Sequence, residues 1–227
     1  MPTEPRTTTA PSPRRWRQLL RGALAAALPH RLFLVRGPAD SGRVCLTFDD
    51  GPHPEYTPQV LDVLRDHGVP ATFFVIGREA ERYPELVRRM AAEGHAVGHH
   101  SYCHTAPTLT PARQLVEELR RTDHLLTGLL GTPPHLYRPP HGKVTAAKLW
   151  GLWRAGQTVV LWNVDPKDSA RPRPEDVRAW FREHPLRGGD IVLMHDNGPH
   201  AAAVVPDLIR GASAQGLRFT TPLAWAG

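Results

Sequence analysis

The chain has 227 residues and a formal net charge of +6, and its length fits one globular domain with a tail. Its contents of 41% hydrophobic and 22% charged residues are ordinary for a folded protein. The two cysteines, Cys45 and Cys103, are too few for a disulfide framework and favour a reducing compartment. The positive charge is spread along the chain without basic runs that alternate with aromatic residues, which argues against nucleic-acid binding.

The first 30 residues differ in composition from the rest of the chain. Residues 1–13 are rich in Thr and Pro and are expected to be disordered. Residues 14–28 combine arginines with a short apolar run, which predicts a basic amphipathic helix that contacts a membrane face. No run reaches the ~20 apolar residues of a transmembrane helix. We therefore expect a cytoplasmic, membrane-peripheral protein; the alternative is export by an atypical signal, although Arg21 interrupts the apolar run.

Apolar runs of strand length alternate with amphipathic helical patterns along the remainder of the chain. Strands are predicted over residues 44–48, 71–76, 95–98, 136–138, 158–163, 191–194 and 217–220, and helices over 58–67, 84–93, 110–130, 145–155, 174–183 and 201–215. About seven such repeats predict a parallel sheet, closed or nearly closed, with the helices outside. We therefore expect a tail over residues 1–30 and one α/β domain over residues 31–227.

Polar and ionisable residues gather at the ends of five predicted strands. They are Asp49 and Asp50, His100 and His104, Arg138, Asp165 and Asp168, and His195. Taken alone, Asp-Asp-Gly-Pro is an ordinary turn sequence. In parallel α/β folds, however, sites lie at the carboxyl ends of the strands, so the five groups are expected to meet at one rim.

Two histidines and one carboxylate form a candidate metal site. His100 and His104 are four residues apart and can reach one ion from a helix face or a tight turn. With Asp50 they make a His₂-Asp set, which is typical of a catalytic zinc or similar divalent ion. His99 is expected to face away from its neighbour, and Cys103 would add a thiolate that hydrolytic chemistry does not need.

Five motifs follow one another along the chain: Thr47–Pro52, His100–His104, Arg138–Gly142, Asp165–Asp168 and Ile191–Asp196. In this order they resemble the motifs of the NodB-homology polysaccharide deacetylases, which are carbohydrate esterase family four. The resemblance implies a distorted (β/α)₇ barrel of the glycoside hydrolase/deacetylase type. It also implies a metal-dependent hydrolase that removes the acetyl group from an N-acetylated sugar, which could be a polysaccharide, an oligosaccharide or a carrier-linked sugar.

The resemblance further implies how the metal and the general base are held. Asp50, His100 and His104 would bind one divalent metal ion, with zinc the first choice and cobalt or another divalent ion as alternatives. Asp49 would be the general base that deprotonates a water molecule on the metal. Arg138 would fix Asp49 and balance its charge.

The resemblance also implies an acid and a substrate pocket. His195 would protonate the leaving amine, and Asp168 would hydrogen-bond His195 and raise its pKa. The backbone N–H of His141 would stabilise the oxyanion. Leu193, with apolar neighbours, would line the pocket for the acetyl methyl group.

Three positions depart from the pattern of that family. His99 stands where an Asn is common, His141 replaces the usual Tyr, and Ser169 replaces a Trp that would flank the catalytic histidine. The loss of that Trp puts the usual pocket for a glycan polymer in doubt, and Trp162 is not assumed to replace it. The compact chain favours a lipid-linked or nucleotide-linked sugar, or another small acetamido compound.

Two rival functions stay open at this point. One is the hydrolysis of a non-sugar amide or imide on the same fold, and the other is a catalytically silent sugar-binding protein. Binding alone needs no matched acid and base, so the presence of Asp49, Arg138 and His195 argues against the second rival.

Overall fold

The computed structural model describes residues 22–24, 27–106 and 108–226. The predicted disorder of residues 1–13 and most of the predicted helix over residues 14–28 lie outside these residues. Residues 22–24 and 27, which belong to that predicted helix, are helical. Within the described residues, no helix is long and apolar enough to cross a membrane.

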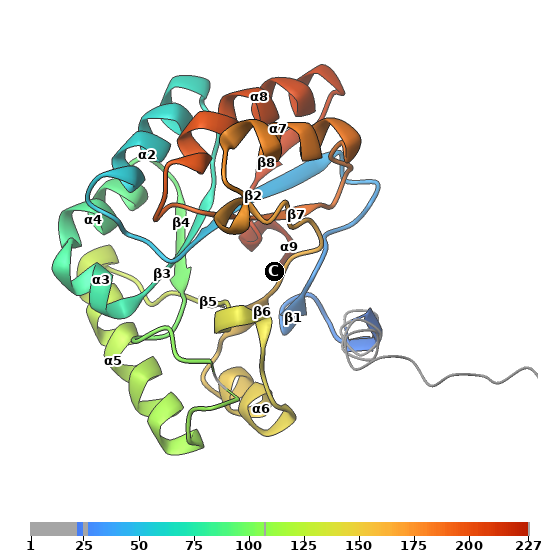
Figure 1. The fold of residues 1–227 in the computed structure, drawn as a ribbon. Helices are drawn as coiled ribbons and strands as arrows, with labels where there is room; N and C mark the ends of the chain where they lie inside the picture. Colours follow the sequence, from blue (N-terminus) through green and yellow to red (C-terminus); the bar gives the residue numbers. More distant parts are fainter. Residues whose placement is uncertain (1–21, 25–26, 107, 227) are drawn as a thin grey trace, which may run out of the picture.

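One parallel sheet forms the centre of the molecule (Figure 1). Its strands are β1 (Phe33–Leu34), β2 (Arg43–Asp49), β3 (Thr72–Val75), β4 (Ala96–His99), β5 (Leu136–Tyr137), β6 (Thr158–Val160), β7 (Ile191–His195) and β8 (Arg218–Thr220). The strand order is β1-β6-β5-β4-β3-β2-β7, and β8 pairs with the first residues of β2. Beyond the end of β6, Val164 forms a parallel bridge with Val192 of β7. In the strand order, β6 and β7 lie at opposite ends of the row β6-β5-β4-β3-β2-β7. The bridge between them nearly closes this row into a barrel, as the sequence predicts.

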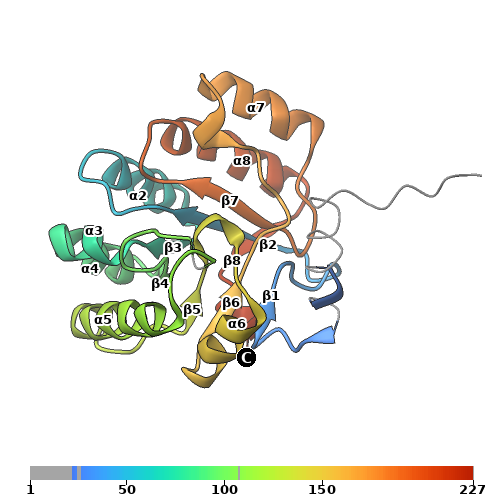
Figure 2. The same ribbon diagram turned by 60° about the horizontal axis from the view of Figure 1, so that its bottom comes forward.

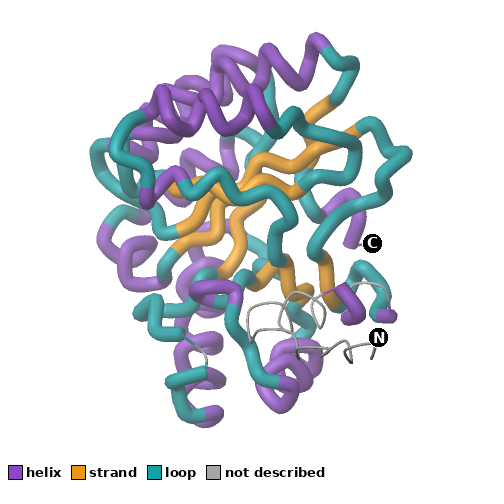
Figure 3. Tube along the Cα trace, turned by 45° about the vertical axis from the view of Figure 1, so that its right-hand side comes forward, coloured by secondary structure: helices purple, strands orange, loops and turns teal. Residues whose placement is uncertain are grey.

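Helices cover the outside of this barrel (Figures 2 and 3). They are α2 (Tyr56–His67), α3 (Gly77–Arg82), α4 (Pro84–Ala92), α5 (Ala112–Leu130), α6 (Ala146–Arg154), α7 (Pro174–Glu183) and α8 (His200–Ala214), with two short 3₁₀ helices, η1 (Pro140–Gly142) and η2 (Asp168–Ala170). The short helix α9 (Leu223–Ala226) instead packs Trp225 against strand residues such as Cys45 and Ile191. The largest apolar cluster lies between the strands and helices α2, α4 and α8, where Phe48, Leu61 and Val205 are fully buried. Strands buried on both faces explain why their sequences are continuous apolar runs.

Two short helices of the described residues, α3 and the terminal α9, were not predicted from the hydrophobic pattern. Helix α3 has the sequence GREAER and no apolar stripe. It forms where the chain leaves β3, because the N–H groups of Gly77 and Arg78 donate to the carbonyl oxygens of Ser101 and Tyr102. The helix predicted from residue 110 begins at Ala112 in the structure, and the Thr110 hydroxyl donates to the Ala106 carbonyl ahead of it.

Candidate active site

The two adjacent aspartates reach one site because the backbone turns between them. Asp49 is the last residue of β2, and Asp50 adopts a left-handed conformation with φ of 75°. In a continued strand, Asp50 would point to the opposite face of the sheet. A positive φ is uncommon for residues other than glycine and is concentrated at functional sites. The turn therefore brings both carboxylates to the rim at the carboxyl end of the barrel.

Asp50, His100 and His104 converge as the sequence predicts. One ligand atom from each residue lies within 4.8 Å of the others. The Oδ1 atom of Asp50 is 3.0 Å from Nε2 of His104 and 3.4 Å from Nε2 of His100. A turn, and not a helix, brings His100 and His104 to the same site. In this turn Ser101 and His104 have φ values of 65° and 61°, and the His104 N–H donates to the Ser101 hydroxyl.

The donor set of these three residues fits a divalent cation. The Nδ1 atom of His100 donates to the Arg138 carbonyl at 2.8 Å, which leaves Nε2 as an acceptor in the neutral imidazole. That acceptor faces the carboxylate of Asp50, and Oδ1 of this carboxylate is buried without a hydrogen-bond partner in the described part of the chain. Two facing acceptors need a proton or a cation between them, and two imidazoles with one carboxylate are the ligands of zinc and similar ions.

Charge at this cluster also favours an ionised carboxylate. Burial by itself raises the pKa of Asp50, but the neighbouring imidazoles of His100 and His104 outweigh it, and the pKa lies well below its ordinary value. Asp50 is therefore ready to bind a cation at neutral pH. The two excluded neighbours behave as expected: His99 faces away, with Nε2 at 2.7 Å from Asp123, and the free thiol of Cys103 is exposed.

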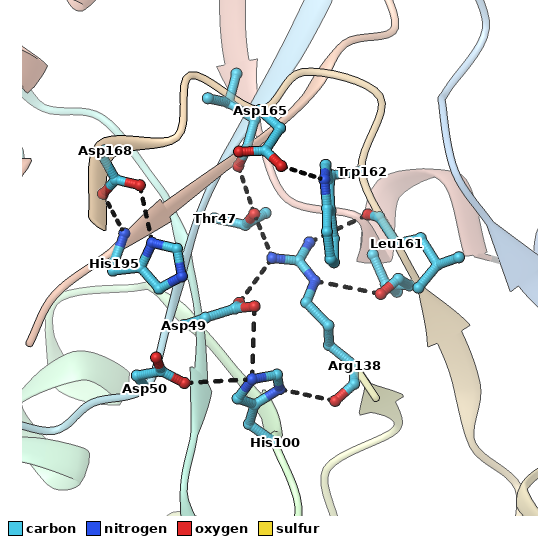
Figure 4. Close-up of polar contacts among 12 residues, drawn as sticks. Thr47, Asp49, Asp50, His100, Arg138, Leu161, Trp162, Asp165, Asp168 and His195 are labelled. Carbon is cyan, nitrogen blue, oxygen red and sulfur yellow. Dashed lines mark hydrogen bonds and ion pairs between the residues drawn. The ribbon is translucent and has the colours of Figure 1, made fainter. Parts of the chain in front are cut away.

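A buried guanidinium holds the first aspartate (Figure 4). Arg138 is fully buried, and its Nη1 lies 2.7 Å from both Oδ1 of Asp49 and the hydroxyl of Thr47. Its Nε and Nη2 donate to the carbonyl oxygens of Val160 and Leu161. Burial lowers the pKa of Arg138 and the Asp49 carboxylate opposes that shift, so the guanidinium stays charged. One oxygen of Asp49 is thus fixed, while Oδ2 lies 3.6 Å from Nε2 of His100, on the side of the candidate metal site.

A second carboxylate holds the imidazole at the end of β7. The Nδ1 atom of His195 is 2.8 Å from Oδ1 of Asp168, and the backbone N–H of His195 donates to the other oxygen at 2.8 Å. Burial by itself lowers the pKa of His195, but the hydrogen bond and the charge of Asp168 outweigh it and raise the pKa to about 9. His195 is therefore protonated at neutral pH, and with Nδ1 committed to Asp168, its Nε2–H is the group left to donate a proton.

The remaining predicted site residues lie near these groups. The His141 ring packs against His104 with 4.9 Å between ring centroids, and its backbone is left-handed with φ of 57°. Leu193 is buried in β7, beside Thr47 of β2. The contacts show the positions of His141 and Leu193, and their roles at the oxyanion and the acetyl group stay predictions.

Trp162 packs among Asp165, Arg138 and Gly142. Its indole N–H donates to Asp165 at 3.3 Å, and the ring lies 5.5 Å from the Arg138 guanidinium carbon. The same ring covers Gly142, where an added Cβ would come within 2.9 Å of it. Ser169, in η2, is exposed, although its neighbour Asp168 is buried.

Sequence reasoning missed a buried acid that supports the turn of the aspartate pair. Asp196 is 1% exposed, accepts a 2.5 Å hydrogen bond from the Thr57 hydroxyl, and donates its N–H to the Asp49 carbonyl. Its carboxylate also touches Gly51, where an added Cβ would lie 2.1 Å from Oδ2, so only glycine fits there. Burial raises the pKa of Asp196 to about 7. The available signal was its position directly after β7, like that of the other strand-end residues.

A nearly closed parallel barrel with carboxylates and imidazoles at the carboxyl ends of its strands is the arrangement of an α/β-barrel enzyme. The sequence profile of the family described as polysaccharide deacetylase matches residues 36–160. The chain is 39% identical over 193 residues to a peptidoglycan-N-acetylglucosamine deacetylase of Bacillus cereus, which covers 83% of this chain and 70% of the relative. It is 37% identical over 183 residues to a chitooligosaccharide deacetylase of Rhizobium leguminosarum bv. trifolii, with 81% and 82% covered.

The same relationship is found among solved structures. The Bc1960 peptidoglycan N-acetylglucosamine deacetylase, in complex with 4-naphthalen-1-yl-N-oxidanyl-benzamide, superposes with a TM-score of 0.82 at 30% identity and covers 86% of this chain and 92% of its own. The chain therefore belongs to the polysaccharide deacetylase family, whose members include carbohydrate N-deacetylases that use a divalent metal. The predicted family and the predicted barrel are confirmed.

Proposed function

We propose that the chain is a metal-dependent hydrolase that removes the acetyl group from an N-acetylglucosamine unit of a glycan. The observation that carries the proposal is the meeting of three metal-type ligands with a separately held carboxylate and a separately held imidazolium at one rim. A protein that only binds a sugar would need neither the separately held carboxylate nor the separately held imidazolium. The class of substrate follows from the relatives, which are named for peptidoglycan N-acetylglucosamine and for chitooligosaccharides.

The first half of the proposed reaction uses Asp49. A divalent ion bound by Asp50, His100 and His104 would lower the pKa of a water molecule and polarise the amide carbonyl. Arg138 fixes one oxygen of Asp49 and leaves the other on the side of the ligands. That free oxygen takes the proton of the attacking water, as a general base does.

The second half uses His195. An amine is a poor leaving group unless it is protonated, and the imidazolium of His195 supplies the proton to the amide nitrogen. Asp168 holds the imidazolium through Nδ1 and so keeps Nε2–H directed away from itself. The backbone N–H of His141 is the proposed donor to the oxyanion, and Leu193 lies at one wall of the proposed acetyl pocket.

The test is acetate release by the purified protein. The protein is stripped with a chelator, reloaded with zinc or cobalt, and offered N-acetylglucosamine oligomers, peptidoglycan, and lipid- or nucleotide-linked N-acetyl sugars. We expect metal-dependent release from at least one glycan, and a loss of about 10³-fold in Asp49→Asn with the metal retained. Metal binding without turnover on any acetamido sugar would contradict the proposal, and turnover on simple amides or imides alone would favour the non-sugar alternative.

The location of the protein is a separate proposal that rests on the sequence. We propose a cytoplasmic protein whose basic residues 14–28 bind an anionic membrane face. Sedimentation with anionic and neutral vesicles tests the membrane binding. The full chain should sediment with anionic vesicles but not with neutral ones. A variant with residues 14, 15, 17 and 21 changed from Arg to Gln should sediment with neither. Equal binding by both chains would contradict the proposal.

A further inference from the structure

Three of the four large apolar side chains that are exposed in the described part of the chain lie in one region of the molecule. Leu109 is 79% exposed, Trp150 is 61% exposed and Val116 is 41% exposed. They belong, in that order, to the loop between β4 and α5, to α6 and to α5. The fourth, Leu223, belongs to α9. A single exposed apolar side chain is ordinary, but several on neighbouring elements indicate a surface that contacts a partner.

Packing between α5 and α6 makes these elements neighbours. The two helices share one apolar cluster, which includes Leu115, Leu119, Leu149 and Leu152. The ammonium group of Lys148, in α6, donates to the carbonyl oxygen of Thr110, the residue after Leu109. Figures 1 and 2 both show α5 and α6 side by side. Leu109, Val116 and Trp150 are thus exposed on elements that contact one another.

Basic side chains accompany the exposed apolar ones. Arg113 and Arg120 are exposed on α5, on either side of Val116, and Arg154 is exposed at the end of α6. None of these three arginines makes an ion pair with another of the described residues. Among the described residues of α5 and α6, Glu117 is the one exposed acid. Three unpaired guanidinium groups against one carboxylate leave this region with a net positive charge, which complements an anionic partner.

The basic N-terminal segment joins the domain beside the same two helices. Leu24 and Leu28 pack against the apolar cluster that α5 and α6 share, next to Trp153 of α6. Residues 14–21, which directly precede this helical segment, contain four arginines in the sequence. A surface that attracts residues 14–21 would therefore also lie close to α6.

We propose that one surface of the folded domain contacts an anionic lipid bilayer, and that it consists of Leu109, Arg113, Val116, Arg120, Trp150 and Arg154, here called the α5–α6 surface. Exposed Trp and Leu side chains enter the boundary between headgroups and acyl chains, and the arginines bind the anionic headgroups. The contact adds to the proposed binding of residues 14–28. Leu109 lies in the same loop as His104, so the contact holds the active-site rim beside the membrane. The inference goes beyond the proposed reaction and does not depend on which sugar is deacetylated.

The first test removes the apolar side chains. The partition coefficient of the full chain is measured on vesicles of phosphatidylcholine and phosphatidylglycerol. In the double variant Leu109→Ser/Trp150→Ser it should fall about tenfold, because less apolar area enters the bilayer. This ratio should persist at high salt, since burial of apolar area is not screened. Leu223→Ser is the matched control: Leu223 is 49% exposed but lies on α9, and its loss should leave the coefficient unchanged.

The second test removes positive charge. Arg113→Gln/Arg154→Gln should lower the partition coefficient by about 20-fold at physiological salt and by much less at high salt, because both arginines lie near the anionic headgroups. Arg88→Gln/Arg218→Gln is the control with the same change in net charge. Both of its arginines are exposed, on α4 and β8, and make no ion pair with other described residues. It should bind like the native chain within about twofold.

Insertion is measured through Trp150 itself. Vesicles with brominated acyl chains quench tryptophans that enter the bilayer. At equal bound protein, the native chain should lose more fluorescence than Trp150→Phe, which keeps an apolar ring and should still bind. Equal quenching of the two chains would overturn the insertion of Trp150.

The outcomes separate this inference from the proposed function, because acetate release from soluble substrates is not the readout. Native binding by Leu109→Ser/Trp150→Ser would overturn the α5–α6 surface and leave residues 14–28 as the whole membrane contact. Equal losses in the variants and their controls would show a general effect of charge or apolarity and would also overturn it. A native dimer that dissociates in Leu109→Ser/Trp150→Ser without a change in vesicle binding would assign the surface to a second copy of the chain. No binding of the native chain to anionic vesicles would overturn the inference together with the proposed location.

Discussion

The two halves of the site are held by the protein in different ways. The proton-transfer half, which consists of Asp49, Arg138, Asp168 and His195, is tied into the barrel by hydrogen bonds, and the first three of these residues are at least 97% buried. The ligand half, which consists of Asp50, His100 and His104, depends on two left-handed residues in loops. His104 is a quarter exposed, whereas Arg138 is fully buried.

This difference indicates which geometry exists before any ligand binds. Asp49 and His195 each have a charged or hydrogen-bonded partner that fixes them within the protein, as preorganised catalysis requires. In the ligand half, Nε2 of His100 and Oδ1 of Asp50 face each other as two acceptors, so neither fixes the other. A bound cation would interact with both. We therefore expect the first half to contribute to folding stability and the second half to depend on the metal.

The largest effect on activity is expected from the ligand half. In His104→Ala, bound metal and acetate release should be lost together, because the cluster would keep only two ligands. The stability of the metal-free protein should change by less than about 1 kcal/mol, since the side chain is partly exposed and its contacts are confined to the site. Metal content, acetate release and urea unfolding of the chelated protein measure these three quantities.

An exposed histidine provides the control for that variant. His184→Ala, in a residue that lies on the surface after α7, should keep both metal and activity. Full metal stoichiometry in His104→Ala would disprove the ligand assignment. A loss of several kcal/mol in the chelated His104→Ala protein would show that the ligand half also supports the fold and would remove the contrast.

The largest effect on stability is expected from the proton-transfer half. Arg138→Gln should lower the free energy of unfolding by about 3–5 kcal/mol, because it leaves the buried Asp49 carboxylate and two carbonyl oxygens without their partner. Arg121→Gln is the control: that arginine pairs with Glu81 at the surface, and its loss should cost less than about 1 kcal/mol. Denaturant titration at neutral pH measures both, and equal values for the two variants would contradict the contrast.

The sequence was informative where burial decides structure. The apolar runs predicted seven strands, the barrel and five strand ends, because parallel strands buried on both faces need continuous apolar sequence. Helix α3 could not be predicted in this way, since its sequence has no apolar face and the backbone contacts that start it come from the loop after β4. Periodicity carries no information about such contacts.

The same limit applies within the site. The motifs located Asp50 and His104 but not their left-handed backbones. Asp and His adopt positive φ more often than most residues other than glycine, but they do so in only a small minority of positions, so tertiary packing has to select it here. The contact of Asp196 with Thr57 and Gly51 joins segments 139 and 145 residues apart, and a single sequence offers no pattern for it. The roles of His141 and Leu193 stay predictions for a related reason, because their contacts fit several functions.

The pH dependence of activity tests the proton-transfer half through its proposed acid, His195. If His195 is the proposed acid, it acts in its protonated form, so activity should fall as pH rises through about 9 in the native protein. In Asp168→Asn, the main cause of the raised pKa is lost, so the alkaline limb should move towards the ordinary histidine pKa of ~6.5. The sign for stability is the same: the His195–Asp168 pair stabilises fully below ~6.5 and the contribution is lost as pH rises through about 9.

Another aspartate of the same loop serves as the control for this shift. Asp165 bonds Trp162 and Lys167 and not His195, so Asp165→Asn should leave the alkaline limb in place. Profiles of kcat/KM from pH 6 to about 10 distinguish the variants. An unchanged alkaline limb in Asp168→Asn would show that His195 is not the acid that this limb reports.

The smallest effect is expected at Asp196, which contacts both halves through the Asp49 carbonyl and Gly51. Burial raises its folded-state pKa to about 7, so its contribution to stability is fully present below the ordinary carboxyl pKa of ~3.9 and is lost as pH rises through about 7. Asn has no charge to lose and still accepts from Thr57. Asp196→Asn should therefore be more stable than the native chain by about 1–2 kcal/mol at pH 8 and similar to it near pH 4.

Urea unfolding at the two pH values measures this difference, with the exposed Asp66→Asn as the control that should show none. The activity of Asp196→Asn then decides how the halves are connected. If acetate release stays within about tenfold of native while stability at pH 8 rises, the neutral contact alone keeps the Asp49–Asp50 turn in place. A large loss of metal together with unchanged stability would instead assign the Asp196 charge to the ligand half, because the carboxylate would then act through Gly51 on Asp50.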